Sequence, residues 1–187
     1  MPYRFVVITA LSALLLSGCS TPPTLESKPA AVPAGLDLSG QWRITDESAE
    51  TNRQIVEDRR RAAGGSGFSD PRRSKAKKGS LLYVFLETGT ELKITQTDSG
   101  LFISFNRAIV EEYRFGENRG ITVGPIAAVR ASGWEDGGYV IETLGEKGNL
   151  LIERYLLEDD GRLLLRQISI FQKEELLLSV VQKFDRV

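Results

Sequence analysis

The chain has no histidine and a single cysteine in 187 residues. Without histidine it lacks the commonest general base and metal ligand, and every serine–histidine catalytic site is excluded. One cysteine allows no disulfide within the chain, so the core alone must hold the fold together. The Gly-x-x-x-x-Gly-Lys-Ser/Thr pattern of a phosphate-binding loop is also missing. The sequence therefore excludes the most familiar catalytic centres.

Long hydrophobic runs are scarce as well. The uncharged apolar run at the N-terminus extends only from Phe5 to Leu16, whereas a transmembrane helix needs about 20 residues. Arg4 precedes this run, and two small residues and Cys19 follow it. This layout predicts a secretory signal peptide over residues 1–18. Two interpretations of Cys19 are open: a lipid attachment site, or a bystander beside a simple secretory signal.

The end of this segment, Leu16-Ser17-Gly18-Cys19, resembles the lipobox of bacterial lipoproteins. In that family the cysteine thiol carries a diacylglycerol, the chain is cut before the cysteine, and the new amino group receives a fatty acid such as palmitate. The resemblance implies that Cys19 is the lipidated first residue, and we expect no cofactor besides this covalent lipid. Aspartate at the second position favours inner-membrane retention in these proteins, and Ser20 stands there. We expect a lipid-anchored protein of the outer membrane that faces the periplasm.

Residues 19–35 are predicted to form a lipidated, flexible tether. Between Ser20 and Gly35 there are four prolines and many small residues, which disfavour both helix and sheet. From residue 36 the composition changes, and residues 36–187 are predicted to form one β-domain, long enough to fold alone.

Apolar and polar residues alternate through this domain, which is the signature of strands. Besides a first strand around Trp42, the segments predicted as strands are Leu81–Leu86, Glu91–Thr97, Leu101–Asn106, Val110–Phe115, Gly120–Val123, Ala127–Trp134, Tyr139–Leu144, Asn149–Glu158, Arg162–Phe171 and Leu176–Arg186. Turn residues such as Asp136-Gly137 and Asp160-Gly161 separate them and favour hairpins. The pattern predicts an all-β antiparallel meander, closed into a barrel or folded into a sandwich.

Gly40-Gln41-Trp42 at the start of the first strand resembles the Gly-x-Trp motif of lipocalin-like (calycin-type) barrels. In that family the tryptophan plugs the closed end, and a basic residue from the last strand packs over it. The resemblance implies that Lys183 or Arg186 covers Trp42. A closer likeness is to uncharacterised exported bacterial proteins, which share Trp134-Glu-Asp-Gly, Glu153-Arg-Tyr155, Asp160-Gly-Arg162 and Phe184-Asp-Arg186. These motifs favour a lipocalin-like β-barrel.

Residues 46–80 interrupt the strand pattern as a basic insertion, partly helical or disordered, that we expect to lie outside the barrel. Thr51 to Ala63 could form a short helix, and few large apolar residues are available for burial. Nine basic and three acidic residues lie between Arg53 and Lys78. The candidate binding residues for an anionic envelope component are Arg59, Arg60, Arg61, Arg72, Arg73, Lys75, Lys77 and Lys78.

Two functions from different classes are open. In the first, the barrel holds a small apolar or amphipathic molecule near the membrane. In the second, the barrel is filled by side chains, and its surface or basic insertion docks an envelope partner. We expect neither an enzyme nor a nucleic-acid-binding protein. The acidic groups Glu111-Glu112, Glu135-Asp136, Glu158-Asp159-Asp160 and Glu174-Glu175 fall at predicted strand ends or turns, where charges are normally solvated.

Overall fold

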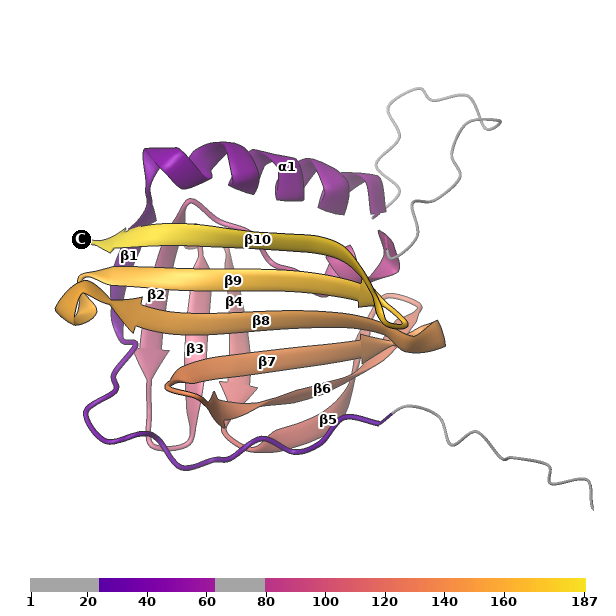
Figure 1. Ribbon diagram of the computed structural model, residues 1–187, viewed down its shortest axis with the longest axis horizontal. Coiled ribbons are helices and arrows are strands. Elements are labelled where there is room, and N and C mark those ends of the chain that lie inside the picture. The colour runs from indigo at the N-terminus through magenta and orange to yellow at the C-terminus, as the bar shows by residue number, and fades with distance from the viewer. Residues whose placement is uncertain (1–23, 63–79) are drawn as a thin grey trace, which may run out of the picture.

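Ten strands form one antiparallel sheet in the computed structural model, which describes residues 24–62 and 80–187 (Figure 1). The strands are β1 (Gly40–Ile44), β2 (Glu91–Gln96), β3 (Gly100–Phe105), β4 (Ile109–Arg114), β5 (Glu117–Val123), β6 (Ile126–Glu135), β7 (Gly138–Gly145), β8 (Asn149–Glu158), β9 (Leu163–Gln172) and β10 (Glu175–Arg186). The short 3-10 helix η2 (Glu146–Gly148) connects β7 to β8, and η3 (Asp159–Gly161) connects β8 to β9. The predicted strands from residue 91 onward are confirmed, most within one or two residues of their ends.

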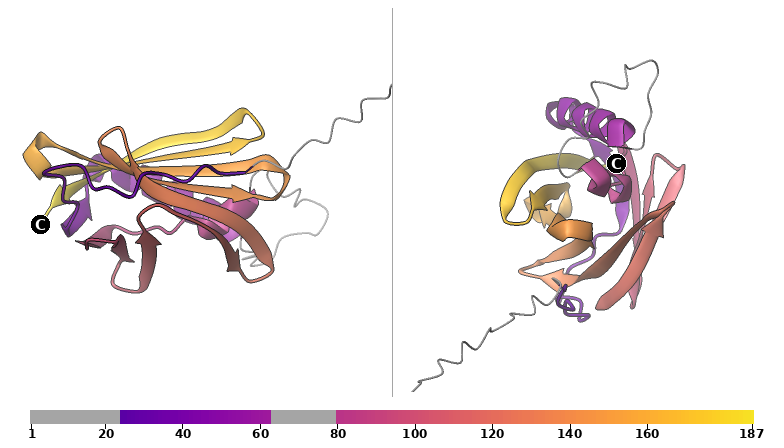
Figure 2. Two further views of the ribbon diagram at one scale, coloured as in Figure 1. Left: turned by 90° about the horizontal axis from the view of Figure 1, so that it is seen from below. Right: turned by 90° about the vertical axis from the view of Figure 1, so that its right-hand side faces the viewer.

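The sheet is ordered β4-β3-β2-β1-β10-β9-β8-β7-β6-β5, so β1 pairs with both β2 and the last strand. It curls round on itself into a nearly closed barrel (Figure 2). Its two edges, β4 and β5, follow each other in the chain, but no ladder joins them within the described residues. The predicted lipocalin-like barrel is confirmed, with a gap between these two strands.

The turns follow the chemistry of their residues. Asp136 and Gly137 both have positive φ, 48° and 74°, between the paired residues Glu135 and Gly138. Two central residues with positive φ define the type I′ hairpin, which matches the twist of paired strands. The Asp-Gly signal thus fixes the β6–β7 hairpin and its register.

Trp42 lies at one end of the barrel and is 1% exposed. Its indole N–H donates to the carbonyl of Leu38 at 3.2 Å, and the Arg186 guanidinium lies 4.2 Å from the ring centroid. Arg186 also donates to the carbonyl of Ser39 at 2.8 Å. A Cβ on Gly40 would come within 2.6 Å of this guanidinium. Of the two candidate cations, Arg186 covers Trp42, whereas Lys183 pairs with Glu47 at 3.0 Å.

The interior has two apolar clusters. The first surrounds Trp42 at the closed end and includes Phe105, Tyr139 and Phe184. The second lies towards the opposite, open end of the barrel, where Ile168 and its neighbours on β8 and β9 meet the helices described next. Charged side chains from β6, β8 and β9 lie between the two clusters, as set out below.

The segment predicted as a strand over Leu81–Leu86 is instead a 3-10 helix, η1 (Ser80–Phe85). Its side chains from Leu82 to Phe85 are buried against the second apolar cluster. A continuous apolar run without alternation does not distinguish a buried strand from a buried helical turn. Here the run covers the open end of the barrel rather than joining the sheet.

Residues 46–62 form α1 (Asp46–Ala62), which packs on β10 and η1. The predicted helix in this part of the insertion is confirmed, but the expectation that it has little to bury is wrong. Ser48, Asn52 and Ile55 share one buried face of the helix. Ser48 accepts a hydrogen bond from the Lys183 amide at 2.9 Å, and Asn52 accepts one from the Gln182 amide group at 3.0 Å. The helix docks mainly through polar contacts, which hydrophobic patterning does not reveal.

Residues 24–35 also differ from the predicted flexible tether, because they lie against the outside of the barrel (Figure 1). Lys28 pairs with Glu142 at 2.7 Å and with Glu135 at 3.1 Å. Burial alone would lower the pKa of Lys28, but hydrogen bonds to these two carboxylates outweigh burial and raise it. The segment forms neither helix nor strand, as its prolines predict. No helix among the described residues has the length and apolarity needed to cross a membrane.

Candidate functional site

A pocket of about 400 Å³ lies at the gap between β4 and β5, bordered by η1 and the end of α1. Its walls are Arg59, Val84, Phe85, Glu87, Glu111, Arg119, Gly120, Ile121, Thr122, Val123 and Arg130. Alternation along β4, β5 and β6 turns Glu111, Ile121 and Arg130 to the inner face of the sheet. The gap between β4 and β5 therefore gives access from the side to the barrel interior near its open end.

Arg130 is the central cation of this pocket and is buried. It donates to Glu111 at 3.2 Å, and its guanidinium lies 5.1 Å from the centroid of the Tyr113 ring. Burial opposes the charge of Arg130, whereas the charge of Glu111 and its hydrogen bond favour it, and the pKa of Arg130 is raised. The Nε atom of Arg130 is buried without a hydrogen-bond partner among the described residues. The Arg130 side chain thus lines the pocket with one buried donor that has no partner there.

Glu87 faces the same pocket from the segment after η1. One of its oxygens pairs with the guanidinium of Arg59. Its other oxygen, Oε2, is buried and has no hydrogen-bond partner in the part of the chain that the structure describes. Burial raises the pKa of Glu87, and the positive charge of Arg59 opposes this rise. Glu87 and Arg130, which both line the pocket, thus each keep one buried polar atom without a partner among the described residues.

Deeper in the barrel, Arg166 is fully buried, and each of its three nitrogens has a hydrogen-bond partner. Its Nε donates to Glu153 at 3.0 Å, and a terminal nitrogen donates to the carbonyl of Glu87 at 2.8 Å. Gln182 accepts a further, longer hydrogen bond at 3.4 Å. Burial raises the pKa of Tyr155 far above its usual range, so the phenol remains neutral and donates to Glu153 at 3.3 Å. This ion pair fills the centre of the barrel.

The predicted binding residues are only partly brought together. Arg59 lies in the pocket, paired with Glu87, and Arg61 pairs with Glu57 and Asp58. Arg60 is exposed on the last turn of α1. The helix carries five acidic residues against four arginines, so it adds no net positive charge. Arg72, Arg73, Lys75, Lys77 and Lys78 lie outside the described residues, as does Cys19.

Sequence reasoning missed the inner charges. Glu111 belongs to the middle of β4 rather than to a turn, and it faces inward. A usable signal was present in β8, where Glu153 and Tyr155 share one face with the buried Leu151. An acidic residue in phase with core residues marks a buried charge that needs a partner. The partner Arg166 comes from β9, in phase with Leu164 and Ile168, and only the paired strands reveal the match.

No known protein-family model matches the chain, and no curated protein matches its sequence. Solved structures do match its fold. Secretory abundant heat soluble protein 4 from Ramazzottius varieornatus is 13% identical with a TM-score of 0.50, covering 84% of this chain and 99% of that chain. Lipid binding protein 8 from Caenorhabditis elegans, in its apo form, is 12% identical with a TM-score of 0.50, covering 84% and 100%. At such low identity these likenesses support the lipocalin-like barrel fold alone.

Proposed function

We propose that this protein is a lipid-anchored protein of the outer membrane, facing the periplasm, whose barrel binds a small amphipathic molecule with an anionic head. The pocket between β4 and β5 is the binding site. The lipobox-like sequence before Cys19 supports the anchor, and the fold shared with a protein named for lipid binding supports an apolar component in the ligand. The covalent lipid on Cys19 is the anchor and not the ligand.

The observation that carries the proposal is the free Nε of buried Arg130 at the wall of a 400 Å³ cavity. A buried polar group without a partner costs about 1–3 kcal/mol, and more if it is charged. An anionic head that accepts from Arg130 removes this cost. The apolar walls Phe85, Ile121 and Val123 then contact the tail of the same molecule. A cavity of this size lies in the usual range for small ligands, about 300–1,000 Å³.

The proposal is tested with two ligands that share a tail. Mature protein carrying Cys19→Ser is titrated with a medium-chain fatty acid and with the alcohol of the same length. Arg130→Met should weaken binding of the acid by about tenfold, equivalent to about 1.4 kcal/mol, and leave the alcohol nearly unchanged. Arg154→Met is the matched control, since Arg154 lies on the outer face of β8 near Glu135 and Asp136. Binding that is absent, or equally weakened for both ligands, would reject the site.

A second function is favoured by the filled centre of the barrel. The Arg166–Glu153 pair occupies the position where a large ligand would otherwise extend into the barrel. In this alternative the protein is a structural or interaction lipoprotein that docks an envelope partner through its surface or basic insertion. Native mass spectrometry of protein released from its own membrane separates the two. A retained small molecule supports the first function, and a retained protein with no small molecule supports the second.

A further inference from the structure

The N-terminal segment is fixed along the outside of β6. The carbonyl of Pro29 accepts a hydrogen bond from the amide of Trp134 at 2.9 Å. Four residues earlier, the carbonyl of Leu25 accepts one from the side chain of Asn118 at 2.8 Å. The chain passes so close to Gly133 that a Cβ there would come within 2.5 Å of the Pro29 carbonyl oxygen. These contacts hold the backbone on a defined path towards the open end of the barrel.

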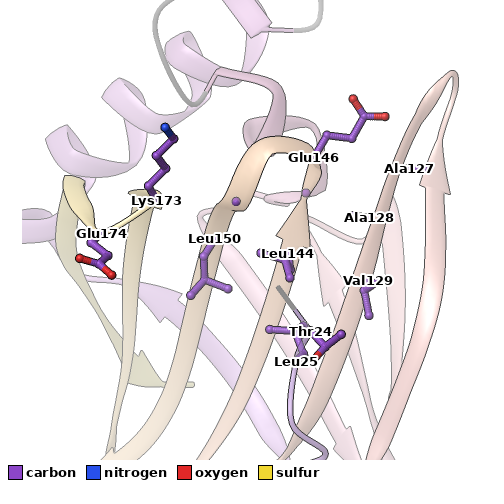
Figure 3. Close-up of a pocket in the computed structure, with 12 residues that line it drawn as sticks. Thr24, Leu25, Ala127, Ala128, Val129, Leu144, Glu146, Leu150, Lys173 and Glu174 are labelled. Carbon is purple, nitrogen blue, oxygen red and sulfur yellow. The ribbon is translucent and has the colours of Figure 1, made fainter. Parts of the chain in front are cut away.

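The path ends in an apolar groove of about 780 Å³ on the outer face of β6, β7 and β8. Figure 3 shows Leu144, Leu150 and Val129 on these neighbouring strands, with Thr24 and Leu25 beside them. Alternation points these strand residues away from the barrel interior, so they form a surface of their own. Thr24, where the described chain begins, is one of the groove walls.

The groove is suited to an uncharged chain. Its middle is lined by Leu25, Val129, Leu144 and Leu150, whose side chains carry no polar atom. The charged residues lie at its margin, with Lys173 and Glu174 on one side and Glu146 on the other (Figure 3). The outer face of an antiparallel sheet is normally polar because water covers it. Apolar residues on several adjacent strands therefore indicate that something other than water covers this part of the face.

We propose that the groove holds one of the fatty acyl chains carried by Cys19 of the same molecule. This inference rests on the proposed lipidation of Cys19. Four residues lie between Cys19 and Thr24, so the two positions are at most about 18 Å apart when the chain is fully extended. The acyl chains are therefore tethered beside the groove, at the high effective concentration of a short linker. A hydrocarbon tail offers no charge to the groove and buries the side chains of Leu144 and Leu150.

The experiment maps the position of the acyl chain by photocrosslinking in intact cells. Cells that make the full-length protein are grown with a palmitate analogue bearing a diazirine near the end of its chain, and are then irradiated. The protein is purified and digested, and crosslinked peptides are identified by mass spectrometry. We expect a crosslink that joins the peptide of Cys19 to peptides containing Leu144 or Leu150 of the same molecule.

Two variants test the groove itself. Leu150→Glu places a charge on the apolar wall and should abolish the crosslink between the Cys19 peptide and this face. Val181→Glu is the matched control, because Val181 is 45% exposed on the outer face of β10, away from the groove. It should leave the crosslink intact. Circular dichroism melting of both variants verifies that they fold.

The outcomes are distinguishable. Crosslinks that carry a phospholipid mass on the groove peptides, or that join two copies of the chain, would assign the groove to another occupant and overturn the inference. Crosslinks confined to other surfaces would also overturn it, with the anchor still standing. A protein that carries no label at Cys19 would overturn both the anchor and the inference. The pocket between β4 and β5 depends on none of these results.

Discussion

At the scale of single residues, the two ends of the barrel differ in how their polar groups are satisfied. Arg186 at the closed end is held over Trp42 and donates to two backbone carbonyls. Arg130 at the gap keeps one donor free. The resemblance to Gly-x-Trp barrels predicted the first arrangement, because it implied that Lys183 or Arg186 of the last strand covers Trp42. The second was beyond prediction, because its members come from β4, β6 and the segment after η1.

Among the residues at the closed end, we expect Trp42 to contribute most to the stability of the fold. Replacing it by alanine removes a buried indole that fills this end and contacts Arg186. Trp42→Ala should lower the free energy of unfolding by about 3–5 kcal/mol, measured by urea denaturation. An unchanged denaturation midpoint would contradict the assigned role.

Substitutions of Arg186 and of Lys183 can be compared directly, because both residues lie on β10 and both were candidates to cover Trp42. Arg186→Met removes the cation over the indole ring, which contributes about 0.5–2 kcal/mol, together with its two hydrogen bonds. Lys183→Met removes only an exposed pair with Glu47, and such pairs contribute at most about 1 kcal/mol. Denaturation curves of the two variants should therefore differ, with Arg186→Met the less stable. Equal curves would remove any special role of Arg186.

Glu87 makes the stability of the protein depend on pH. Its pKa is raised in the folded state, so the folded protein holds this proton more tightly than the unfolded chain. Folding stability then falls as pH rises from the ordinary glutamate pKa, about 4.3, through the higher folded value. Glu87→Gln removes this titration. Its stability relative to the wild type should therefore increase with pH across that window, as measured by urea denaturation at a series of pH values. A constant difference between the two proteins would contradict the raised pKa.

At the scale of elements, prediction succeeded where patterning is regular. Alternation and Asp-Gly turns placed the strands β2 to β10. They did not place η1, whose apolar run has no period, or the docked face of α1, which is largely polar. Nor did they place residues 24–35, which are held by Lys28 and by backbone hydrogen bonds. Composition reports what a segment can bury, whereas α1 and residues 24–35 dock largely through specific polar partners.

The docking of α1 gives a test within one helix. Ile55 is buried beneath the helix and Val56, its neighbour, is 43% exposed. Ile55→Ala should destabilise the protein by about 2–5 kcal/mol because it leaves a cavity under the helix. Val56→Ala should change stability by no more than about 0.5 kcal/mol. Thermal unfolding of both variants checks the difference, and equal effects would mean that α1 does not contribute to the core.

At the scale of the whole molecule, the surfaces on which the proposed functions depend lie towards the open end of the barrel. The pocket between β4 and β5, the helix η1 and the outer groove all lie there. The described chain also begins there, at a wall of the groove (Figure 3). An anchor on Cys19 would therefore tether the molecule by the end that carries the proposed binding pocket. A ligand that partitions into membranes would then have a short path to Arg130.

The anchor is the prediction on which this arrangement depends. Cys19→Ala removes the only thiol in the chain, so lipid attachment and cleavage at this position should both fail. Wild-type protein with two or more acyl chains should remain in the membrane fraction, since two chains give stable anchoring. Metabolic labelling with a fatty-acid analogue, followed by membrane fractionation, measures both properties. Ser20→Ala is the control and should stay labelled, because it keeps the cysteine. Equal labelling of the wild type and Cys19→Ala would place the lipid elsewhere. An acyl chain would then not be tethered beside the outer groove through Cys19.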